Sequence, residues 1–188
     1  MPDKPGRPFR VGVASDRLRI ETERLILRKP QLDDAEALVE MIGDAETMRF
    51  IGDGSTGGIV AAQRALEKWV ARWEANDIGF FMLERREDGR FVGRAGFLVW
   101  DPATWTVAEL HEGCEVEIGW TIVRSQWGNG YATEAALALR DWTDRRRLIS
   151  LIQHGNDRSV RVAEKIGERY ERDVEVRGIA TGLYALER

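Results

Sequence analysis

Residues 115–142 place an alternating segment, a glycine-containing turn and a helix-forming run in direct succession. EVEIGWTIV at 115–123 alternates polar and apolar residues, which is typical of a strand. The turn contains Gly128 and Gly130, which let a ligand approach the backbone without Cβ atoms in the way. The first amides of the following helix have no intrahelical acceptor. The segment therefore predicts a cradle for an anion such as phosphate.

Two familiar phosphate-binding motifs do not fit this turn. The dinucleotide-binding fingerprint needs a third small residue where Thr133 stands, and an acidic residue about 20 positions further on. The region around Ser150 reads LISLIQ and contains no acid. A P-loop needs a Gly-Lys-Ser/Thr triplet, which does not follow. On these residues alone, a turn with a purely structural role remains the alternative.

Hydrophobic patterning predicts a sheet with helices around this segment. Strands are expected at 24–28, 115–123, 148–153, 170–177 and 181–186, and as a hairpin across 79–100. Helices are expected at 32–42, capped by Asp33 with Glu36 three residues on, at 159–167, and where Ala62, Leu66, Trp69 and Trp73 share one face. This mixture of hairpins and strand–helix–strand units predicts an α/β or α+β fold with helices on the faces of a sheet.

Length and composition limit the number of domains, the classes of partner and the cellular compartment. A length of 188 residues suggests one domain with a sizeable core. The net charge of −4 argues against a nucleic-acid partner, and no apolar run is long enough for a membrane span. The single cysteine favours a reducing, cytoplasmic setting, and the few Cys and His residues match no zinc pattern. Residues 1–20 read as a frayed lead-in or an edge strand, and residues 21–188 as the domain.

Four pieces of the chain carry a resemblance to a known family. They are ETERLILRKPQLDDAEAL at 21–38, EVEIGWTIVRSQWGNGYATEAALAL at 115–139, NDRSVRVAEKIG at 156–167 and GLYALER at 182–188. In this order they resemble the GNAT superfamily of acetyl-CoA-dependent N-acetyltransferases, and most of all its RimJ/RimL-like branch of ribosomal-protein alanine acetyltransferases. The resemblance implies a mostly antiparallel sheet of six or seven strands, splayed in the middle, with helices on both faces.

The resemblance also implies a site for acetyl-CoA as cosubstrate and no metal. Amides from Gly128 to Thr133 would hold the pyrophosphate, the pantetheine arm would lie along the strand, and Asn156 would bind that arm from the other side. The family pattern has Gln or Arg where Trp127 stands, a departure that matters little if backbone amides do the binding. The implied cofactor-binding set is Trp120, Thr121, Ile122, Trp127, Gly128, Asn129, Gly130, Tyr131, Ala132, Thr133, Asn156 and Ser159.

Acetyl transfer to an amine needs a group that accepts the amine proton. Glu117 is the first candidate for this base and Glu115 the second, since the two share one face of their strand. The alternative is that both are solvated or salt-bridged strand residues. Relatives with a base on the next strand have it where Leu151 stands, and those with a tyrosine acid have it where Ala163 stands. Ser159 could donate a proton to the thiolate instead, or it could satisfy backbone groups at the start of its helix.

The remaining reactive side chains have plainer interpretations. Cys114 is expected to be a passive thiol, and His111 and His154 to be surface residues, with a proton-carrying role left open for His154. Trp100 and Trp105 flank a long connection, where they could wall an acceptor cleft or pack in the core.

The leading hypothesis is an N-acetyltransferase in which a primary amine attacks acetyl-CoA directly in a ternary complex. The acceptor would be a protein N-terminus or a small amine, selected by the loops at 52–58 and 101–114. The oligomeric state stays open, and a homodimer is one option. A CoA-binding sensory or scaffold module with little catalysis is the alternative, and a nicotinamide-dependent redox domain is a weaker third possibility.

Overall fold

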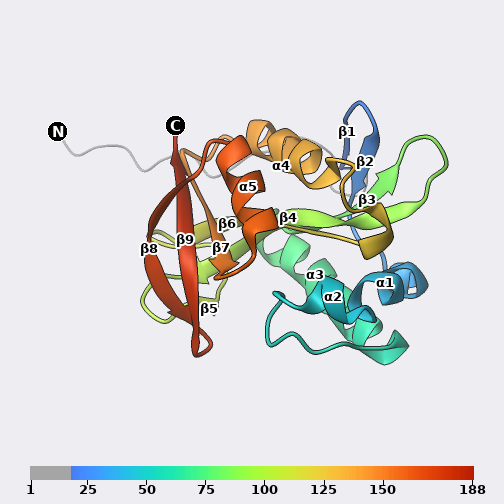
Figure 1. Ribbon diagram of the computed structural model, residues 1–188, viewed down its shortest axis with the longest axis horizontal. Coiled ribbons are helices and arrows are strands. Elements are labelled where there is room, and N and C mark those ends of the chain that lie inside the picture. Colours follow the sequence, from blue (N-terminus) through green and yellow to red (C-terminus); the bar gives the residue numbers. More distant parts are fainter. Residues whose placement is uncertain (1–17) are drawn as a thin grey trace.

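The computed structural model describes residues 18–188, which form one mixed sheet with helices on both of its faces (Figure 1). The helices are α1 (Ala35–Ile42), α2 (Ala45–Met48), α3 (Ile59–Asn76), α4 (Tyr131–Trp142) and α5 (Asp157–Lys165). The strands are β1 (Arg19–Glu21), β2 (Leu25–Arg28), β3 (Phe80–Arg85), β4 (Phe91–Asp101), β5 (Thr106–Val107), β6 (Glu115–Ile122), β7 (Arg147–Gln153), β8 (Arg169–Val176) and β9 (Ile179–Glu187).

The strand order is β1-β2-β3-β4-β6-β7-β9-β8, with β5 beside β4. Neighbouring strands are antiparallel except β6 and β7, which run parallel and share the single registered pair Glu117 and Ile149. Beyond that pair the two strands diverge, which confirms the predicted splay in the middle of the sheet. Within residues 18–188 the sheet has nine strands instead of six or seven, because β1 and β5 add three and two residues that are too short to leave a periodic pattern.

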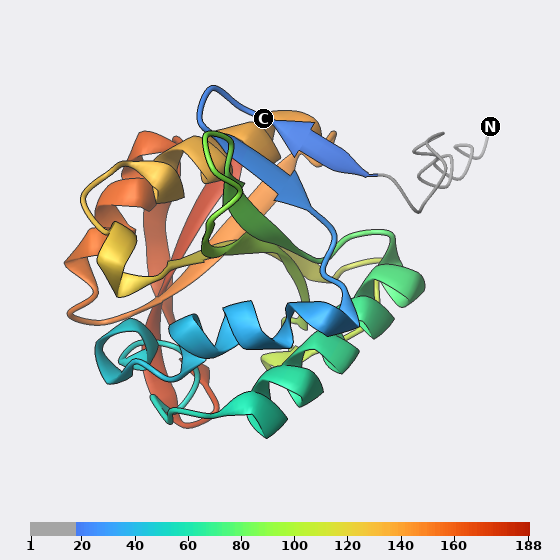
Figure 2. The same cartoon turned by 90° about the vertical axis from the view of Figure 1, so that its right-hand side faces the viewer.

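The helices divide between the two faces of the sheet, as predicted (Figure 2). On one face, α4 buries Ala135, Ala136 and Leu139 in a core that also contains Ile118. On the other face, α1 and α3 pack against β3, and their core includes Leu66 of α3. A third cluster holds Trp100 and Trp105 against β7 and β9.

The cap of the first helix and the start of the first strand differ from the sequence predictions. Asp33 does not cap the first helix. Asp34 is the N-cap residue by position, but its side chain makes no cap hydrogen bond to α1. Its buried carboxylate accepts a hydrogen bond from the amide of Gln31, the residue that precedes the 3-10 turn Leu32–Asp34, at 2.7 Å and pairs with Arg28 of β2. Residues 1–17 of the expected lead-in lie outside the described residues. Strand β1 begins at Arg19, two residues before the expected domain boundary, and lies at one edge of the sheet.

Candidate active site

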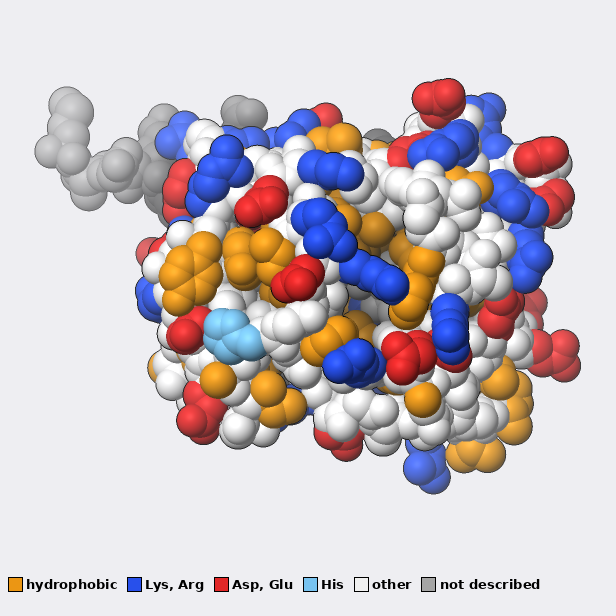
Figure 3. Space-filling model, viewed as in Figure 1, with side chains coloured by type: hydrophobic (Ala, Val, Ile, Leu, Met, Phe, Trp, Pro, Cys, Tyr) orange, Lys and Arg blue, Asp and Glu red, His pale blue; other side chains and the backbone are white. Residues whose placement is uncertain are grey.

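A cavity of about 820 Å³ opens where the carboxyl end of β6 meets the first turns of α4 and α5. Its opposite wall comes from α2 and the residues after it, which include Arg49, Phe50 and Ile51. Figure 3 shows a hollow near the centre of this face with Lys and Arg side chains around it. The cavity-lining cations are Arg49, Arg158, Arg161 and Lys165. This surplus of positive charge suits a ligand with several phosphates.

The glycine turn forms one end of the cavity. Gly128 and Gly130 adopt φ angles of 82° and 80°, in the left-handed region that glycine tolerates best. The first intrahelical bond of α4 runs from the amide of Glu134 to the carbonyl of Gly130 at 3.1 Å, so the amides of the three residues between them have no intrahelical acceptor. A Cβ atom at Gly128 would have no other atom within 4 Å. The turn therefore leaves room for a diphosphate next to unpaired amides.

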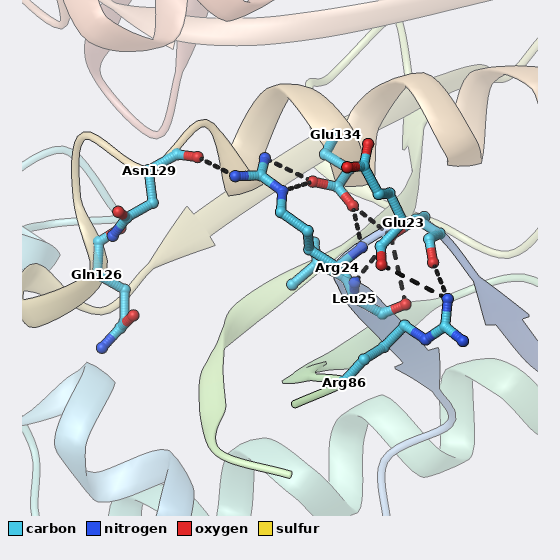
Figure 4. A network of polar contacts seen from close by, with 8 residues as sticks. Glu23, Arg24, Leu25, Arg86, Gln126, Asn129 and Glu134 are labelled. Carbon is cyan, nitrogen blue, oxygen red and sulfur yellow. Dashed lines mark hydrogen bonds and ion pairs between the residues drawn. The ribbon is translucent and has the colours of Figure 1, made fainter. Parts of the chain in front are cut away.

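A network from the N-terminal strands holds the glycine turn in place (Figure 4). The amide of Arg24 donates to one carboxylate oxygen of Glu134 at 2.8 Å, and its Nε donates to the other at 2.7 Å. Nη1 of the same guanidinium donates to the carbonyl of Asn129 at 2.9 Å, and the hydroxyl of Thr22 donates to Glu134 at 2.6 Å. The sequence pattern predicts no role for Arg24, because its partner Glu134 lies 110 residues away.

The structure gathers the predicted cofactor-binding residues at this cavity. All of them line it except Asn129, whose side chain amide donates to the carbonyl of Gln126 at 3.0 Å (Figure 4). The ring of Trp127 lies 4.2 Å from the guanidinium carbon of Arg158, and its indole N–H donates to the carbonyl of Ile122 at 2.7 Å. These contacts connect the turn to both β6 and α5.

The start of α5 forms a further wall of the cavity, in addition to the glycine turn and the segment after α2. Asn156 caps this helix, since its Oδ1 accepts a hydrogen bond from the amide of Ser159 at 3.3 Å. Sequence reasoning missed Arg158, Arg161 and Lys165, which line the cavity from the same helix. Their spacing of three and four residues, which brings them to one helical face, was the available signal.

Glu117 lies on β6 at the point where β6 and β7 separate. The indole N–H of Trp100 donates to its Oε2 at 2.7 Å. Oε1 lies 3.5 Å from the position that a Cβ of Gly119 would take, so the carboxylate extends along its own face of the strand in the direction of Thr121. Thr121 lines the cavity, whereas Glu117 itself is not among the lining residues. Burial raises the pKa of Glu117, while Trp100, the charge of Arg94 and the backbone amide of Leu151 oppose that rise. The result is a desolvated carboxylate next to the strand residues of the cavity.

Glu115 has a different environment although it shares the face of Glu117. Nε of Arg147 donates to both of its oxygens at 3.1 and 3.0 Å. The other nitrogens of Arg147 pair with Glu171 at 2.9 Å and Glu187 at 2.7 Å. Glu115 therefore belongs to an ionic cluster at the far end of β6 from the cavity.

The other residues singled out in the sequence lie away from the cavity. Trp100 and Trp105 are buried against Ile149 and Leu183, although Trp100 also contacts Glu117 as described. Cys114 is a half-buried free thiol that packs against the core. His154 is exposed and lies 3.1 Å from Asp173.

Two kinds of feature are absent from the described residues, a metal-binding cluster and a membrane-spanning helix. Within residues 18–188, no group of His, Cys, Asp and Glu side chains is arranged to hold a metal ion. In the same range, no helix combines the length and apolar character that crossing a membrane requires.

The splayed sheet, the glycine turn at a helix start and the cationic cavity together are the features expected of a site for a phosphate-bearing ligand. Comparison with known proteins agrees, since residues 24–169 match the acetyltransferase (GNAT) domain family. The chain belongs to the GNAT acetyltransferases and is an acetyl-CoA-dependent N-acetyltransferase. This assignment sets aside the nicotinamide-dependent alternative.

Relatives and solved structures support the same family. The uncharacterized protein YkkB of Bacillus subtilis is 30% identical over 165 residues, which are 83% of this chain and 88% of YkkB. An acetyltransferase from Agrobacterium tumefaciens has 25% identity and a TM-score of 0.74, with 96% of this chain and all of that chain covered. RimL, solved with coenzyme A, shares the fold at 15% identity and a TM-score of 0.70, covering 91% of this chain and 97% of its own.

Proposed function

We propose that the enzyme acetylates a primary amine by direct attack on acetyl-CoA in a ternary complex, with Glu117 as the general base. The observation that carries this proposal is the position of the Glu117 carboxylate. It stands at the divergence of β6 and β7 and extends in the direction of the cavity-lining residue Thr121, which shares its face of the strand. This is the end of the strand along which the pantetheine arm would run, through Thr121 and Ile122.

Acetyl transfer to an amine requires mainly that the protein position the two reactants and provide one proton acceptor. An amine is a nucleophile only in its neutral form, so Glu117 accepts its proton directly or through one water as the nitrogen attacks the acetyl carbon. Burial makes Glu117 a stronger base than an exposed glutamate, because it penalises the ionised form. The leaving thiolate has a reference pKa near 8.5 and can depart without a strong acid. Holding both reactants together provides much of the remaining acceleration.

Cosubstrate binding follows from the walls of the cavity. The unpaired amides at the start of α4 would hold the pyrophosphate, and the cations of α5 would face the remaining phosphate. Asn156 uses its Oδ1 as a helix cap, so its amide nitrogen is the group that can donate to the pantetheine arm. Ser159 lines the cavity three residues later and is the candidate donor to the thiolate, while the tyrosine position of relatives holds the buried Ala163.

The acceptor is a primary amine, either a protein N-terminal α-amine or a small molecule. The RimL structure is titled as a ribosomal L7/L12 α-N-protein acetyltransferase, which supports an α-amine as the first class to assay. The loop after α2 borders the cavity at Phe50 and Ile51, so it is placed to contact such an acceptor.

The test compares Glu117→Gln with Glu115→Gln, a matched substitution two residues away on the same face of β6. Release of the CoA thiol is followed with a panel of primary amines. Glu117→Gln should lower kcat by at least about 100-fold with little change in the KM for acetyl-CoA, because it removes the base and leaves the cofactor walls intact. Glu115→Gln should retain kcat within about threefold. Near-normal turnover of Glu117→Gln would remove this residue from the mechanism.

A further inference from the structure

Arg94 is a buried cation without an anionic partner. It lies on β4 and is 9% exposed. Its guanidinium carbon stands 3.8 Å from the centre of the Phe80 ring and 5.4 Å from that of Trp69. Within residues 18–188 the neighbouring charges act on it only at a distance, without a hydrogen bond or ion pair to its side chain. Buried charges in proteins are normally paired, so an anionic group of a ligand is a suitable partner for this arginine.

The sheet register places Arg94 on the same face of the sheet as the proposed base. Arg94 is directly opposite Thr121, and Leu98 is directly opposite Glu117, in the same antiparallel pair. Directly opposite residues, and residues four apart on a strand, share one face. Arg94, Thr121 and Glu117 therefore face the same side of the sheet, toward α3. Thr121 lines the cavity, and its buried hydroxyl also has no hydrogen-bond partner in the described structure.

Further cations lie beyond Arg94 on this side. Arg72 of α3 is half-buried, and its charge lowers the pKa of Arg94, whose own value falls to about 10 mainly through burial. Arg177, in the turn between β8 and β9, acts in the same way on Arg72. The charges acting on Arg94 are thus one carboxylate, that of Glu117, and one further cation. Such an arrangement favours a negatively charged group close to the proposed base.

We propose that the acceptor amine carries an anionic group, a carboxylate or a phosphate, which Arg94 binds together with the hydroxyl of Thr121. This inference rests on the proposed function and specifies its substrate class. A guanidinium already packed over the Phe80 ring can give two parallel hydrogen bonds to such a group with little loss of side-chain freedom. The amine at the other end of the acceptor would then point toward Glu117.

Pairing Arg94 with the acceptor also affects the base. The charge of Arg94 lowers the pKa of Glu117 in the free enzyme. When the acceptor's anion neutralises that charge, the pKa of Glu117 rises and the carboxylate becomes a stronger proton acceptor. An anionic acceptor would therefore gain in both binding and proton transfer, while a neutral analogue would gain in neither.

The experiment uses peptide acceptors that differ in one negative charge and have similar amine pKa values. The pairs are Ala-Ala and its C-terminal amide, Ala-Asp amide and Ala-Asn amide, and Ala-phosphoSer amide and Ala-Ser amide. Thiol release gives kcat/KM for the wild type, Arg94→Gln, Arg94→Lys and Arg64→Gln. Arg64 is an exposed arginine of α3 and serves as the matched control for loss of charge. The carboxylate and phosphate pairs separate the two sources of negative charge.

We expect the wild type to favour the charged member of at least one pair by tenfold or more in kcat/KM. In Arg94→Gln this ratio should fall to within about twofold, in Arg94→Lys it should be intermediate, and in Arg64→Gln it should stay as in the wild type. Equal turnover of both members, or an unchanged ratio in Arg94→Gln, would overturn the inference and leave acetyl transfer intact.

Failure of the proposed function gives a different result. No thiol would then be released with any amine by the wild type. In that case calorimetry of the same peptide pairs binding to the CoA-loaded protein still tests Arg94. Tighter binding of the charged peptide, lost in Arg94→Gln, supports the anion site, and equal binding of both peptides refutes it.

Discussion

Glu168 shows how a single residue can set the pH dependence of stability. It follows α5, is fully buried, and neither of its carboxyl oxygens has a partner in the described structure. Burial raises its pKa to about 8, and the negative charge of Glu117 adds to this rise while the hydroxyl of Ser150 opposes it. An uncharged carboxyl is the form that such a site tolerates, so Glu168 carries a proton at neutral pH.

The sign of its contribution follows from the two pKa values. Below about pH 4.5, the ordinary value, both the folded and the unfolded chain hold this proton. Between that pH and about 8 only the folded chain holds it, so the free energy of unfolding falls as pH rises, and it levels off above. At about 1.4 kcal/mol per unit of pKa the loss is on the order of a few kcal/mol.

Glu168→Gln should remove this pH-dependent loss in the free energy of unfolding, because the amide keeps the shape of the side chain and does not ionise. Urea unfolding at pH 5 and pH 8 measures the effect. The variant should lose much less stability between the two pH values than the wild type. Glu175→Gln, an exposed substitution on β8, should keep the wild-type dependence. An equal fall in the wild type and in Glu168→Gln would show that another group is responsible.

At the scale of one element, the start of α4 determines cosubstrate affinity. Gly130→Glu places a carboxylate where the unpaired amides would hold phosphate, so affinity for CoA should fall at least tenfold. Gly89→Glu is the matched control. Gly89 also has a positive φ, 71°, and open space around it, but it lies in the turn between β3 and β4. Calorimetry should show loss of CoA binding in the first variant alone. Unchanged affinity in a folded Gly130→Glu would contradict the assigned turn.

Elements with a clear local pattern could be predicted from the sequence. The alternation at 115–123 and the glycines before 131 predicted β6, the turn and α4, because strand period, backbone freedom and helix propensity are properties of neighbouring residues. Strands β1 and β5 could not be predicted, since two or three residues define no period. The expected capping by Asp33 could not be corrected from the sequence, since Arg28 of β2 and the amide of Gln31 bind the carboxylate of Asp34 and neither aspartate side chain caps α1.

At the scale of the whole molecule, the site depends on contacts that no local pattern contains. The bond from Trp100 to Glu117 requires the register of β4 against β6, and the unpaired state of Arg94 emerges only when every neighbour is in place. The sequence ranked Glu117 ahead of Glu115 as the candidate base, but it could not show that Arg147 of β7 engages the carboxylate of Glu115. Long-range pairing decides which of two equivalent positions is free to react.

The contacts of Thr22 and Arg24 with Glu134 span 112 and 110 residues, and they tie the segment between β1 and β2 to the first turn of α4. Arg24→Gln removes the donors to Glu134 and to the carbonyl of Asn129, so the turn should become less rigid. A cradle of amides binds phosphate well only if the amides are already oriented. We expect CoA affinity to fall about three- to tenfold in Arg24→Gln and in Glu134→Gln.

A double-mutant cycle separates this coupling from a general loss of stability. If both residues act through one network, the double variant should bind CoA about as weakly as either single variant, with an interaction energy of roughly 0.6–1.4 kcal/mol, which is the three- to tenfold loss of one single variant. Arg19→Gln, which breaks an exposed ion pair on β1, should leave CoA affinity unchanged. Strictly additive losses would mean that the two residues influence the turn independently. A non-additive result would instead show that the N-terminal strands orient the cosubstrate site, although they contribute none of the residues that line its cavity.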